Sequence, residues 1–252
     1  MALTLTITQP FDVPVWRMEI DEFTDTIFLE LRDSASKQVS FAGIDINTGN
    51  LNFKDLEMPE RWLSGIEAGY KGVLILHGYQ SEAVPVHKGL TGIDGSTGDV
   101  LWTDYNVNFE LLAQNGIVVY DARMQPKKPF VINERTGQRT GIFEPATAYY
   151  NNNILLPNMI QADDLPAGLQ NLKPHANVVH YLQHNNFRIV SLHALDGSQL
   201  TQHLYVFNLN DELLFDDIMN NDIQKLQPEA FIVYKNNLIW LKNRSAIKVL
   251  NL

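Results

Sequence analysis

Histidines are the first residues to test for chemistry, because the chain has seven of them and no cysteine. His175, His180 and His184 lie close together in the sequence, and His193 and His203 follow. On a strand, His180 and His184 share a face but stand about 13 Å apart, which is too far for both to bind one metal ion. A metal site would require His193 or His203 to lie alongside from the next strands. We therefore expect partly exposed strand histidines and no metal or other cofactor.

Acidic and nucleophilic residues indicate no catalytic constellation. Asp45 and Asp94 precede two turns at equivalent positions, where a carboxylate caps backbone N–H groups. An acid/base pair instead needs two carboxylates that converge on a substrate. The adjacent acids Asp163-Asp164 and Asp216-Asp217 are expected to be solvated rather than to bind a cation. Because the sequence also lacks a nucleophile elbow and a phosphate-binding loop, no catalytic residue is assigned, and enzyme activity stays an open question.

A segment rich in tyrosine and asparagine is the strongest candidate for binding. Residues 144–176 have no regular period, and a stretch of about thirty such residues inside a compact domain is often functional. Tyr and Asn together form adaptable recognition surfaces, so Tyr149, Tyr150 and Asn152 are the candidate binding residues. The alternative, which we slightly favour, is that the same side chains brace the segment on the rim of the fold.

Strand hairpins with a Thr-Gly turn recur along the chain and are the elements that must position these residues. The clearest copy, residues 92–102, reads Gly-Ile-Asp-Gly-Ser-Thr-Gly-Asp-Val-Leu-Trp. Other copies occur at 43–53 and 130–140, and a looser one occurs at 204–215. Hairpins that recur at intervals of about 40–50 residues indicate the blades of a propeller.

The hairpins divide the chain into five units of short strands. Four-stranded units are expected at 15–53, 63–103, 107–143 and 177–216, and a three-stranded one at 230–250. Residues 2–8 alternate Leu or Ile with Thr and have no nearby partner, so they are predicted to complete the last unit, which removes exposed edges. The sequence thus predicts an all-β fold, a single five-bladed β-propeller domain over residues 1–252 with a non-repeat insertion at about 144–176. Six blades are the alternative, if residues 145–160 form strands of their own.

The repeat resembles that of quinoprotein-like (PQQ-type) propellers, in the order aliphatic strand, Asp, Thr-Gly and Trp over residues 93–102. In that family the Trp docks on a neighbouring blade, which implies packing roles for Trp102 and for the aromatic residues Phe53, Phe143 and Phe215. The resemblance implies the fold and not quinone-dependent activity, because the chain has no cysteine pair and no counterpart of the family's calcium and quinone ligands. The chain also resembles small uncharacterised bacterial propeller proteins, for which the resemblance implies no function.

Charge and composition narrow the range of partners. The formal net charge of −10 disfavours nucleic acid, which is bound by clustered Lys and Arg. No segment approaches the roughly 18 apolar residues of a membrane span, and no secretory signal is evident. We expect a soluble monomer in the cytoplasm, or in the periplasm if a leader has been removed.

These observations favour a non-catalytic binding or scaffolding module whose partner is a protein or a small polar ligand. The alternative is a hydrolase or lyase acting on a small polar or sugar substrate in the central channel of the propeller. A quinone-binding oxidoreductase is a third hypothesis that rests on the resemblance alone.

Overall fold

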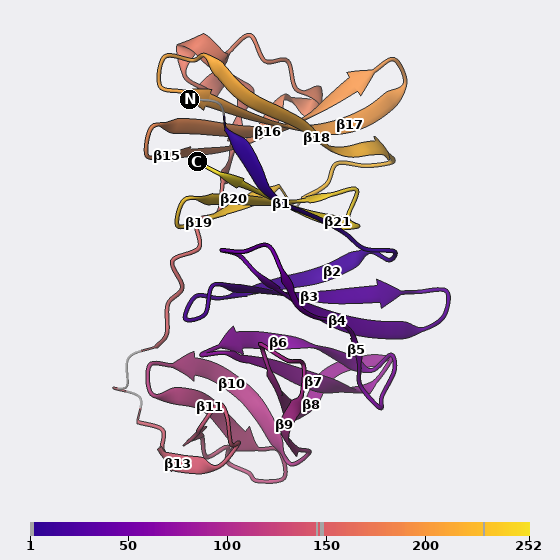
Figure 1. Cartoon of the computed structure of the whole chain (residues 1–252), viewed down its shortest axis with the longest axis vertical. Coiled ribbons are helices and arrows are strands. Elements are labelled where there is room, and N and C mark those ends of the chain that lie inside the picture. Colours follow the sequence, from indigo (N-terminus) through magenta and orange to yellow (C-terminus); the bar gives the residue numbers. More distant parts are fainter. Residues whose placement is uncertain (1–2, 145, 147–148, 229) are drawn as a thin grey trace. The chain divides into compact units, whose positions relative to one another are not determined.

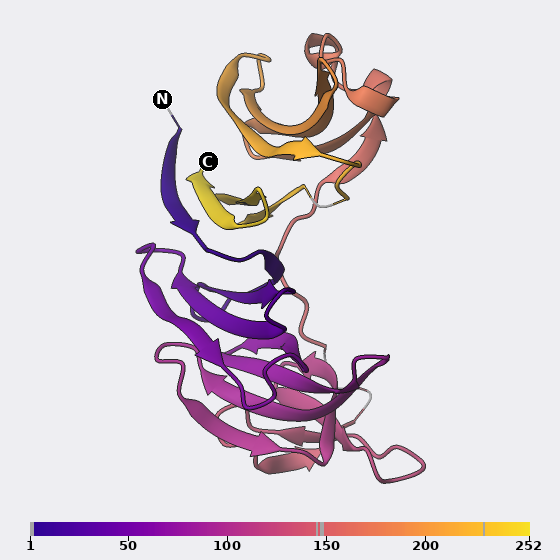
Figure 2. The same cartoon turned by 90° about the vertical axis from the view of Figure 1, so that its right-hand side faces the viewer.

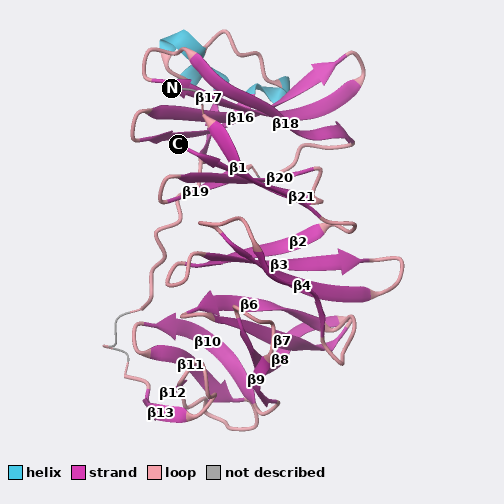
Figure 3. Ribbon diagram, viewed as in Figure 1, coloured by secondary structure: helices cyan, strands magenta, loops and turns pink. Residues whose placement is uncertain are grey.

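Figure 1 shows the computed structural model of the chain, which describes residues 3–144, 146, 149–228 and 230–252. The chain divides into two compact units, one of residues 1–12 with 153–252 and one of residues 13–152. Strands form nearly all of the regular structure (Figure 3), and the helical elements among the described residues are three short 3-10 helices. None of these described helices has the length and apolar character needed to cross a membrane. The predicted all-β class is confirmed.

The unit of residues 13–152 contains three antiparallel sheets, and each is a four-stranded meander in which strands adjacent in sequence pair. Its strands are β2 (Val15–Asp21), β3 (Thr26–Asp33), β4 (Gln38–Asp45) and β5 (Leu51–Glu57), then β6 (Ser64–Tyr70), β7 (Val73–Ser81), β8 (Val84–Asp94) and β9 (Val100–Asp104), then β10 (Val107–Ala113), β11 (Gly116–Asp121), β12 (Phe130–Ile132) and β13 (Arg139–Ile142). These three sheets match the first three predicted units. The β7–β8 hairpin is long, because its strands continue to Ser81 and resume at Val84.

Apolar side chains join neighbouring sheets of this unit face to face. Alternation along β7 supplies both of its interfaces, since successive side chains of a strand point to opposite faces. Leu74 and Leu76 enter the core shared with the β2–β5 sheet, whereas Val73 and Ile75 enter the core shared with the β10–β13 sheet. A strand covered on both faces is continuously apolar, as the run Val73–Leu76 is.

Aromatic residues on the fourth strands dock on the turn of the next sheet. The Trp102 Nε1 of β9 donates a hydrogen bond to the Glu134 carbonyl at 2.7 Å, and a Cβ on Gly137 would lie 2.7 Å from the Trp102 ring. Phe53 of β5 has the same relation to Gly98, where a Cβ would lie 3.0 Å from the ring. Both glycines have positive φ, 81° at Gly98 and 65° at Gly137. The docking implied for Trp102 and Phe53 is confirmed, and glycine is needed both for the turn and for the close approach.

The predicted turn caps are also present. Asp94 Oδ1 accepts a hydrogen bond from the Ser96 backbone N–H at 2.9 Å, and Asp45 Oδ1 accepts one from the Thr48 N–H at 2.8 Å. Asp94 additionally pairs with Arg135 of the next sheet at 2.6 Å. The hydrogen bonds of Ser96 and then the contact with Arg135 lower the pKa of Asp94 to about 2. These aspartates therefore have structural roles.

The unit of residues 1–12 and 153–252 contains two antiparallel sheets. The five-stranded sheet has β14 (Asn158–Gln161), β15 (Val178–His184), β16 (Phe187–Asp196), β17 (Gln199–Asn208) and β18 (Leu213–Ile223), and the four-stranded sheet has β19 (Phe231–Tyr234), β20 (Asn237–Lys242), β21 (Ala246–Asn251) and β1 (Thr4–Pro10). Ile189 and Leu204 of the first sheet share a core with Val233 and Trp240 of the second.

The two ends of the chain meet within one sheet. β1 pairs antiparallel with β21, from Thr4 opposite Asn251 to Pro10 opposite Ala246, and Figure 2 shows the indigo N-terminal strand beside the yellow C-terminal one. The predicted use of the N-terminal strand to complete the last sheet is therefore present. β14 joins the β15–β18 sheet, so the described residues form five sheets and the 144–176 segment adds a strand to an existing one.

Part of the 144–176 segment covers a sheet face. It contains the 3-10 helices η1 (Ala162–Asp164), η2 (Ala167–Leu169) and η3 (His175–Asn177). Leu165 and Leu169 are buried against Val190 and Phe207 of the five-stranded sheet. Residues 162–169 thus have the packing that the brace interpretation requires.

Candidate functional site

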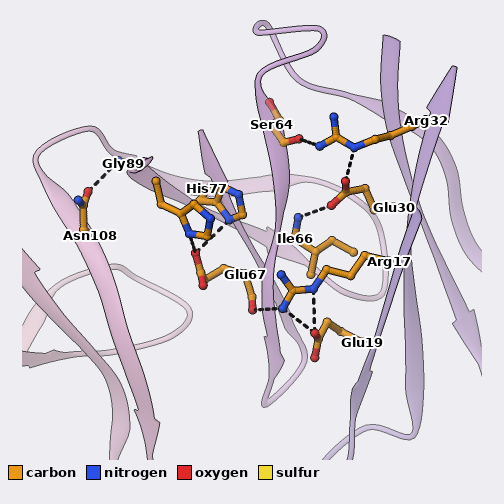
Figure 4. Close-up of polar contacts among 11 residues, drawn as sticks. Arg17, Glu19, Glu30, Arg32, Ser64, Ile66, Glu67, His77, Gly89 and Asn108 are labelled. Atoms are coloured by element: carbon orange, nitrogen blue, oxygen red, sulfur yellow. Dashed lines mark hydrogen bonds and ion pairs between the residues drawn. The ribbon is translucent and has the colours of Figure 1, made fainter. Parts of the chain in front are cut away.

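Three titratable side chains meet on the β6–β9 sheet. Glu67 lies on β6, His77 on β7 and His87 on β8, and their potential ligand atoms all lie within 4.8 Å of one another. Within the described residues, this is the group of histidine and acidic side chains that is close enough to hold a single ion. Figure 4 shows Glu67 and His77 directed toward each other from neighbouring strands. We call these three residues the Glu67 cluster.

A β-bulge in β6 places the carboxylate. Ile66 pairs with Leu76 and Ala68 pairs with Ile75, so that Glu67 is an extra residue without a partner on β7. Bulges of this kind redirect a side chain and are frequent beside functional sites. The Arg17 guanidinium, itself paired with Glu19 at 2.8 Å, donates a hydrogen bond to the Glu67 carbonyl at 3.2 Å and supports the bulge.

The long β7–β8 hairpin places the two histidines. His87 pairs with Tyr79, which is two residues from His77, and side chains two apart on a strand share a face. The two imidazole rings are stacked, with centroids 3.5 Å apart and planes inclined by 8°. The Tyr79 ring meets the edge of His77 at a centroid distance of 4.7 Å. The histidines are therefore held by register and by ring packing.

Both imidazoles approach one oxygen of Glu67. His87 Nδ1 is hydrogen-bonded to Glu67 Oε2 at 2.7 Å, and His77 Nδ1 lies 3.0 Å from the same atom. The side chains are 1% exposed at His77, 11% at Glu67 and 38% at His87. The cluster is thus buried at its centre and reaches solvent through His87.

The His77 ring is buried without a hydrogen bond. Within the described part of the chain, neither Nδ1 nor Nε2 has a partner in hydrogen-bonding geometry. Nε2 faces a space left by Gly65, where a Cβ would lie 2.9 Å from Nε2 and 3.2 Å from Glu30 Oε2. A buried polar group without a partner is energetically costly and calls for an explanation.

Glu30 belongs to a buried network next to the cluster. Its carboxylate pairs with Arg32 at 2.5 Å and accepts a hydrogen bond from the Ile66 N–H at 2.8 Å (Figure 4). Arg32 also donates to the Ser64 carbonyl at 2.7 Å. The Glu30 side chain is 2% exposed, so its charge is balanced by Arg32 inside the protein. This network fixes the β6 backbone on both sides of Gly65.

The electrostatics keep the carboxylate ionised and the buried imidazole neutral. Burial raises the pKa of the Glu67 carboxyl, but the contacts and charges of His77 and His87 outweigh burial and leave the pKa below its ordinary value. Burial is also the largest effect on His77, and it lowers the pKa of this imidazole. An ionised carboxylate beside a neutral imidazole is the protonation state that metal ligands need.

A small pocket adjoins the cluster on the His77 side. It has a volume of about 70 Å³, and its lining includes His77, Ser64, Lys88 and Tyr105. Sites for small organic molecules usually have about 300–1,000 Å³, whereas a single water occupies only about 10–15 Å³ by this measure. The pocket therefore suits an ion or a few waters.

The residues predicted to bind a ligand lie elsewhere in the same unit. Tyr149 bridges to Ala113 and is 54% exposed. The Tyr150 ring lies 5.6 Å from that of Tyr70, and its hydroxyl is hydrogen-bonded to Glu22. Asn152 is exposed. Tyr150 thus has the contacts of a brace, Tyr149 presents its ring to solvent, and the binding role of all three stays a prediction.

The histidines singled out from the sequence do not assemble into a comparable group. His193 is buried and its Nε2 accepts a hydrogen bond from the Gln227 backbone at 3.0 Å. His203 stacks on Tyr205 at 5.8 Å. Sequence reasoning missed His77 and His87. The sequence did contain a signal for this pair, because His77 and His87 are equally far along the chain from Glu82. A hairpin with its tip at Glu82 brings two such residues close together.

Asp217 was expected to be solvated but has hydrogen-bond partners within the protein instead. Asp217 accepts hydrogen bonds from Lys242 at 2.7 Å, from Lys248 at 3.0 Å and from the Trp240 indole at 3.1 Å. The neighbouring Asp216 is exposed. The expectation of solvated side chains was wrong for Asp217, because β18 brings it against lysines of the next sheet.

Comparisons with known proteins give a partial match to a family model and loose structural similarities. A family model described as a domain of unknown function (DUF4905) matches residues 20–102, a segment that contains the Glu67 cluster. None of the curated proteins matches the chain.

Three solved structures illustrate the structural similarities. BamB from Moraxella catarrhalis is 9% identical, with 99% of this chain and 86% of that chain covered and a TM-score of 0.26. The Dos1 propeller is 12% identical, with 94% and 54% covered and a TM-score of 0.27. A glycosyl hydrolase from Bacteroides ovatus is 9% identical, with 96% and 84% covered and a TM-score of 0.30. Similarities this loose carry no argument about this chain.

Proposed function

We propose that the chain is a non-catalytic binding module that folds as one closed, five-bladed propeller. Three features support the architecture: the meander order of the sheets, the pairing of β1 with β21, and the docking of aromatic side chains on the next Thr-Gly turn. Propellers close in this way to leave only short, protected edges. A crystal structure with the five sheets in one ring would agree with the proposal, and one with two separate units would contradict it.

The observation that carries the binding role is the buried His77, whose ring nitrogens make no hydrogen bond in good geometry among the described residues and which lies between the Glu67 carboxylate and a small pocket. A protein gains nothing in stability from burying such a group, so a ligand that satisfies it is the economical explanation. The size of the pocket favours a small polar ligand or an ion and disfavours an organic substrate.

A thermal-shift screen tests this binding role directly. The full chain is heated with separate panels of metal ions, small anions, sugars and nucleotides. At least one class should raise the midpoint of unfolding, and the rise should disappear in His87→Gln. His184→Gln, a change of the same type in the other compact unit, should retain it. A screen with no shift in any class, or with equal shifts in both variants, would refute the proposed role of the cluster.

A hydrolase is the second candidate function, and one specific contact favours it. His87 is partly exposed and is hydrogen-bonded to Glu67, which is the arrangement of a general base with its orienting carboxylate. His87 would remove a proton from a water molecule, and that water would attack a small polar or sugar substrate at the surface. Turnover of ester, phosphoester or glycoside substrates that is abolished in His87→Gln would establish this candidate and remove the non-catalytic one.

Tyr149, Tyr150 and Asn152 are proposed as a second contact surface, for a protein partner. The exposed Tyr149 ring supports this role, because exposed aromatic rings are frequent anchors at interfaces. Tyr149→Ala should leave the thermal shifts of the ligand screen unchanged if the two surfaces are separate.

A further inference from the structure

We propose that the Glu67 cluster binds one divalent transition-metal ion of the zinc class. The proposal rests on the proposed binding function of the same cluster and names its ligand. Two imidazole nitrogens and one carboxylate oxygen are a donor set that zinc sites use, with a further position for water or for a group of a bound partner.

The donor type selects the class of metal. Imidazole suits zinc, copper, nickel and iron, whereas calcium and magnesium prefer sites made of oxygen ligands only. Two of the three ligands of the Glu67 cluster are histidines. The cluster should therefore favour Zn²⁺, Ni²⁺ and Cu²⁺ over Mg²⁺ and Ca²⁺.

The distances from the Glu67 carboxylate to the two imidazoles are close to those between ligand atoms of a bound ion. The Glu67 Oε2 atom lies 2.7 Å from His87 Nδ1 and 3.0 Å from His77 Nδ1. A tetrahedral ion with bonds of about 2.0–2.2 Å separates its ligand atoms by roughly 3.4 Å. These two distances must therefore open by about 0.4–0.7 Å, and the partly exposed His87 ring must also tilt out of its stack on His77, because the lone pairs of parallel rings do not converge on one ion.

The strands hold the ligands before any ion binds. The three residues come from adjacent strands of one sheet, and the bulge at Glu67 is supported by Arg17. Ligands fixed by register and by packing lose little conformational freedom on binding, which favours affinity.

Buried His77 provides the independent evidence for a ligand. Coordination through Nδ1 would satisfy a nitrogen that has no hydrogen bond within the described residues. Nε2 would then carry the proton and face the side where the Glu30 carboxylate lies, across the space left by Gly65. Metal-bound histidines usually direct their second nitrogen at such an outer acceptor.

The test is calorimetric titration of the full chain, stripped with a chelator, with Zn²⁺. Wild type should bind one equivalent, and Glu67→Gln and His87→Gln should each weaken binding by at least about tenfold. Mg²⁺ and Ca²⁺ should give no binding at the same concentrations. Cobalt(II) provides a spectroscopic readout, because the visible absorption of a nitrogen- and oxygen-ligated four-coordinate ion should be present in wild type and lost in both variants.

Two matched variants serve as controls. Glu110 occupies the same bulge position in β10 that Glu67 occupies in β6, so Glu110→Gln tests a carboxylate in an equivalent setting. His184→Gln tests a histidine outside the cluster. Both should bind Zn²⁺ as wild type does. Because His77 is buried and its replacement could disturb folding, the test uses variants of the partly exposed His87 and of Glu67, and circular dichroism verifies that they fold.

The outcomes separate this proposal from the proposed function. Absence of Zn²⁺ binding, or binding that survives both Glu67→Gln and His87→Gln, would overturn the metal site. If small anions, sugars or nucleotides raise the midpoint of unfolding and His87→Gln removes that rise, the proposed binding function stands with a ligand other than a metal. If neither metal nor any other class depends on His87, both proposals fail.

Discussion

His193 is the buried histidine of the unit that contains β15–β18, and its environment ties stability to pH. The side chain is 5% exposed, and Nε2 accepts the Gln227 N–H, which requires the neutral tautomer with the proton on Nδ1. Burial, together with the charges of His180 and His175, lowers the pKa of His193 to about 4. The unfolded chain, in which a histidine titrates near pH 6.5, therefore binds this proton more readily than the folded chain.

We predict that stability falls as the pH is lowered from 7 to 5. The contribution of neutral His193 is fully present above pH 6.5 and is lost progressively toward pH 4, by about 2 kcal/mol between pH 7 and pH 5. Urea unfolding at both pH values should show this loss in wild type and a smaller loss in His193→Gln. His184→Gln should behave as wild type does. An equal acid sensitivity of wild type and His193→Gln would contradict the assignment.

Asp217 is the carboxylate on which two lysines and an indole converge. Burial raises the pKa of Asp217, but the hydrogen bonds and charges of Lys242 and Lys248 lower it, and the net pKa lies below its ordinary value. The Asp217 side chain is 12% exposed, and the side chains of Lys242 and Lys248 are 29% and 13% exposed. Its removal leaves partly buried charges without a counter-ion.

Asp217→Ala should therefore reduce the free energy of unfolding by about 1–3 kcal/mol. Asp216→Ala, at the exposed neighbouring position, should change it by less than about 0.5 kcal/mol. Chemical denaturation near neutral pH measures both. Similar values for the two variants would show that the lysines find other partners.

At the scale of elements, the docked tryptophan connects two sheets of the 13–152 unit. Gly92 of β8 lies opposite Trp102 of β9, and Gly137 belongs to the turn of the next sheet. A Cβ on Gly92 would lie 2.4 Å from the Trp102 Nε1, and one on Gly137 would lie 2.7 Å from the same ring. The ring is thus confined on two sides and cannot retreat from an added methyl group.

Gly92→Ala should destabilise the protein by about 1–3 kcal/mol, the usual cost of overpacking. Gly141→Ala is the matched control, because a Cβ there meets no atom within 4 Å among the described residues and its φ is not positive. Thermal unfolding and tryptophan fluorescence measure the effect. Unchanged stability in Gly92→Ala would mean that the docking of Trp102 contributes little.

At the scale of the whole molecule, the proposed closed propeller requires that the chain unfold as one cooperative system. Calorimetry should show a single transition, with calorimetric and van't Hoff enthalpies that agree. Gly92→Ala lies in the 13–152 unit and Asp217→Ala in the other, and both should shift that same transition. Two transitions, each sensitive to one variant, would show that the two compact units are separate domains.

The sequence by itself determined the strands and the turns, and its resemblance to quinoprotein-like propellers implied the docking of Trp102. Strands and turns depend on neighbouring residues, because alternation selects strands and Asp and Thr-Gly build turns. The pairing of β1 with β21 was also predictable, since each end of the chain lacked what the other could supply. Local patterns sufficed for the strands and turns because these depend on contacts close in sequence. They sufficed for the pairing of β1 with β21 because the last sheet would otherwise have an unpaired edge.

Only the tertiary structure decided the Glu67 cluster and the packing of Tyr150. The cluster depends on an unpaired residue at Glu67 and on strands that continue to Ser81 and resume at Val84, and both are matters of register between strands. By composition Tyr150 was a candidate either for recognition or for a brace, and its ring packs beside Tyr70 from a distant strand. A shift of register by one residue reverses the face of every side chain, and register is fixed by packing across the sheet, which no local pattern records.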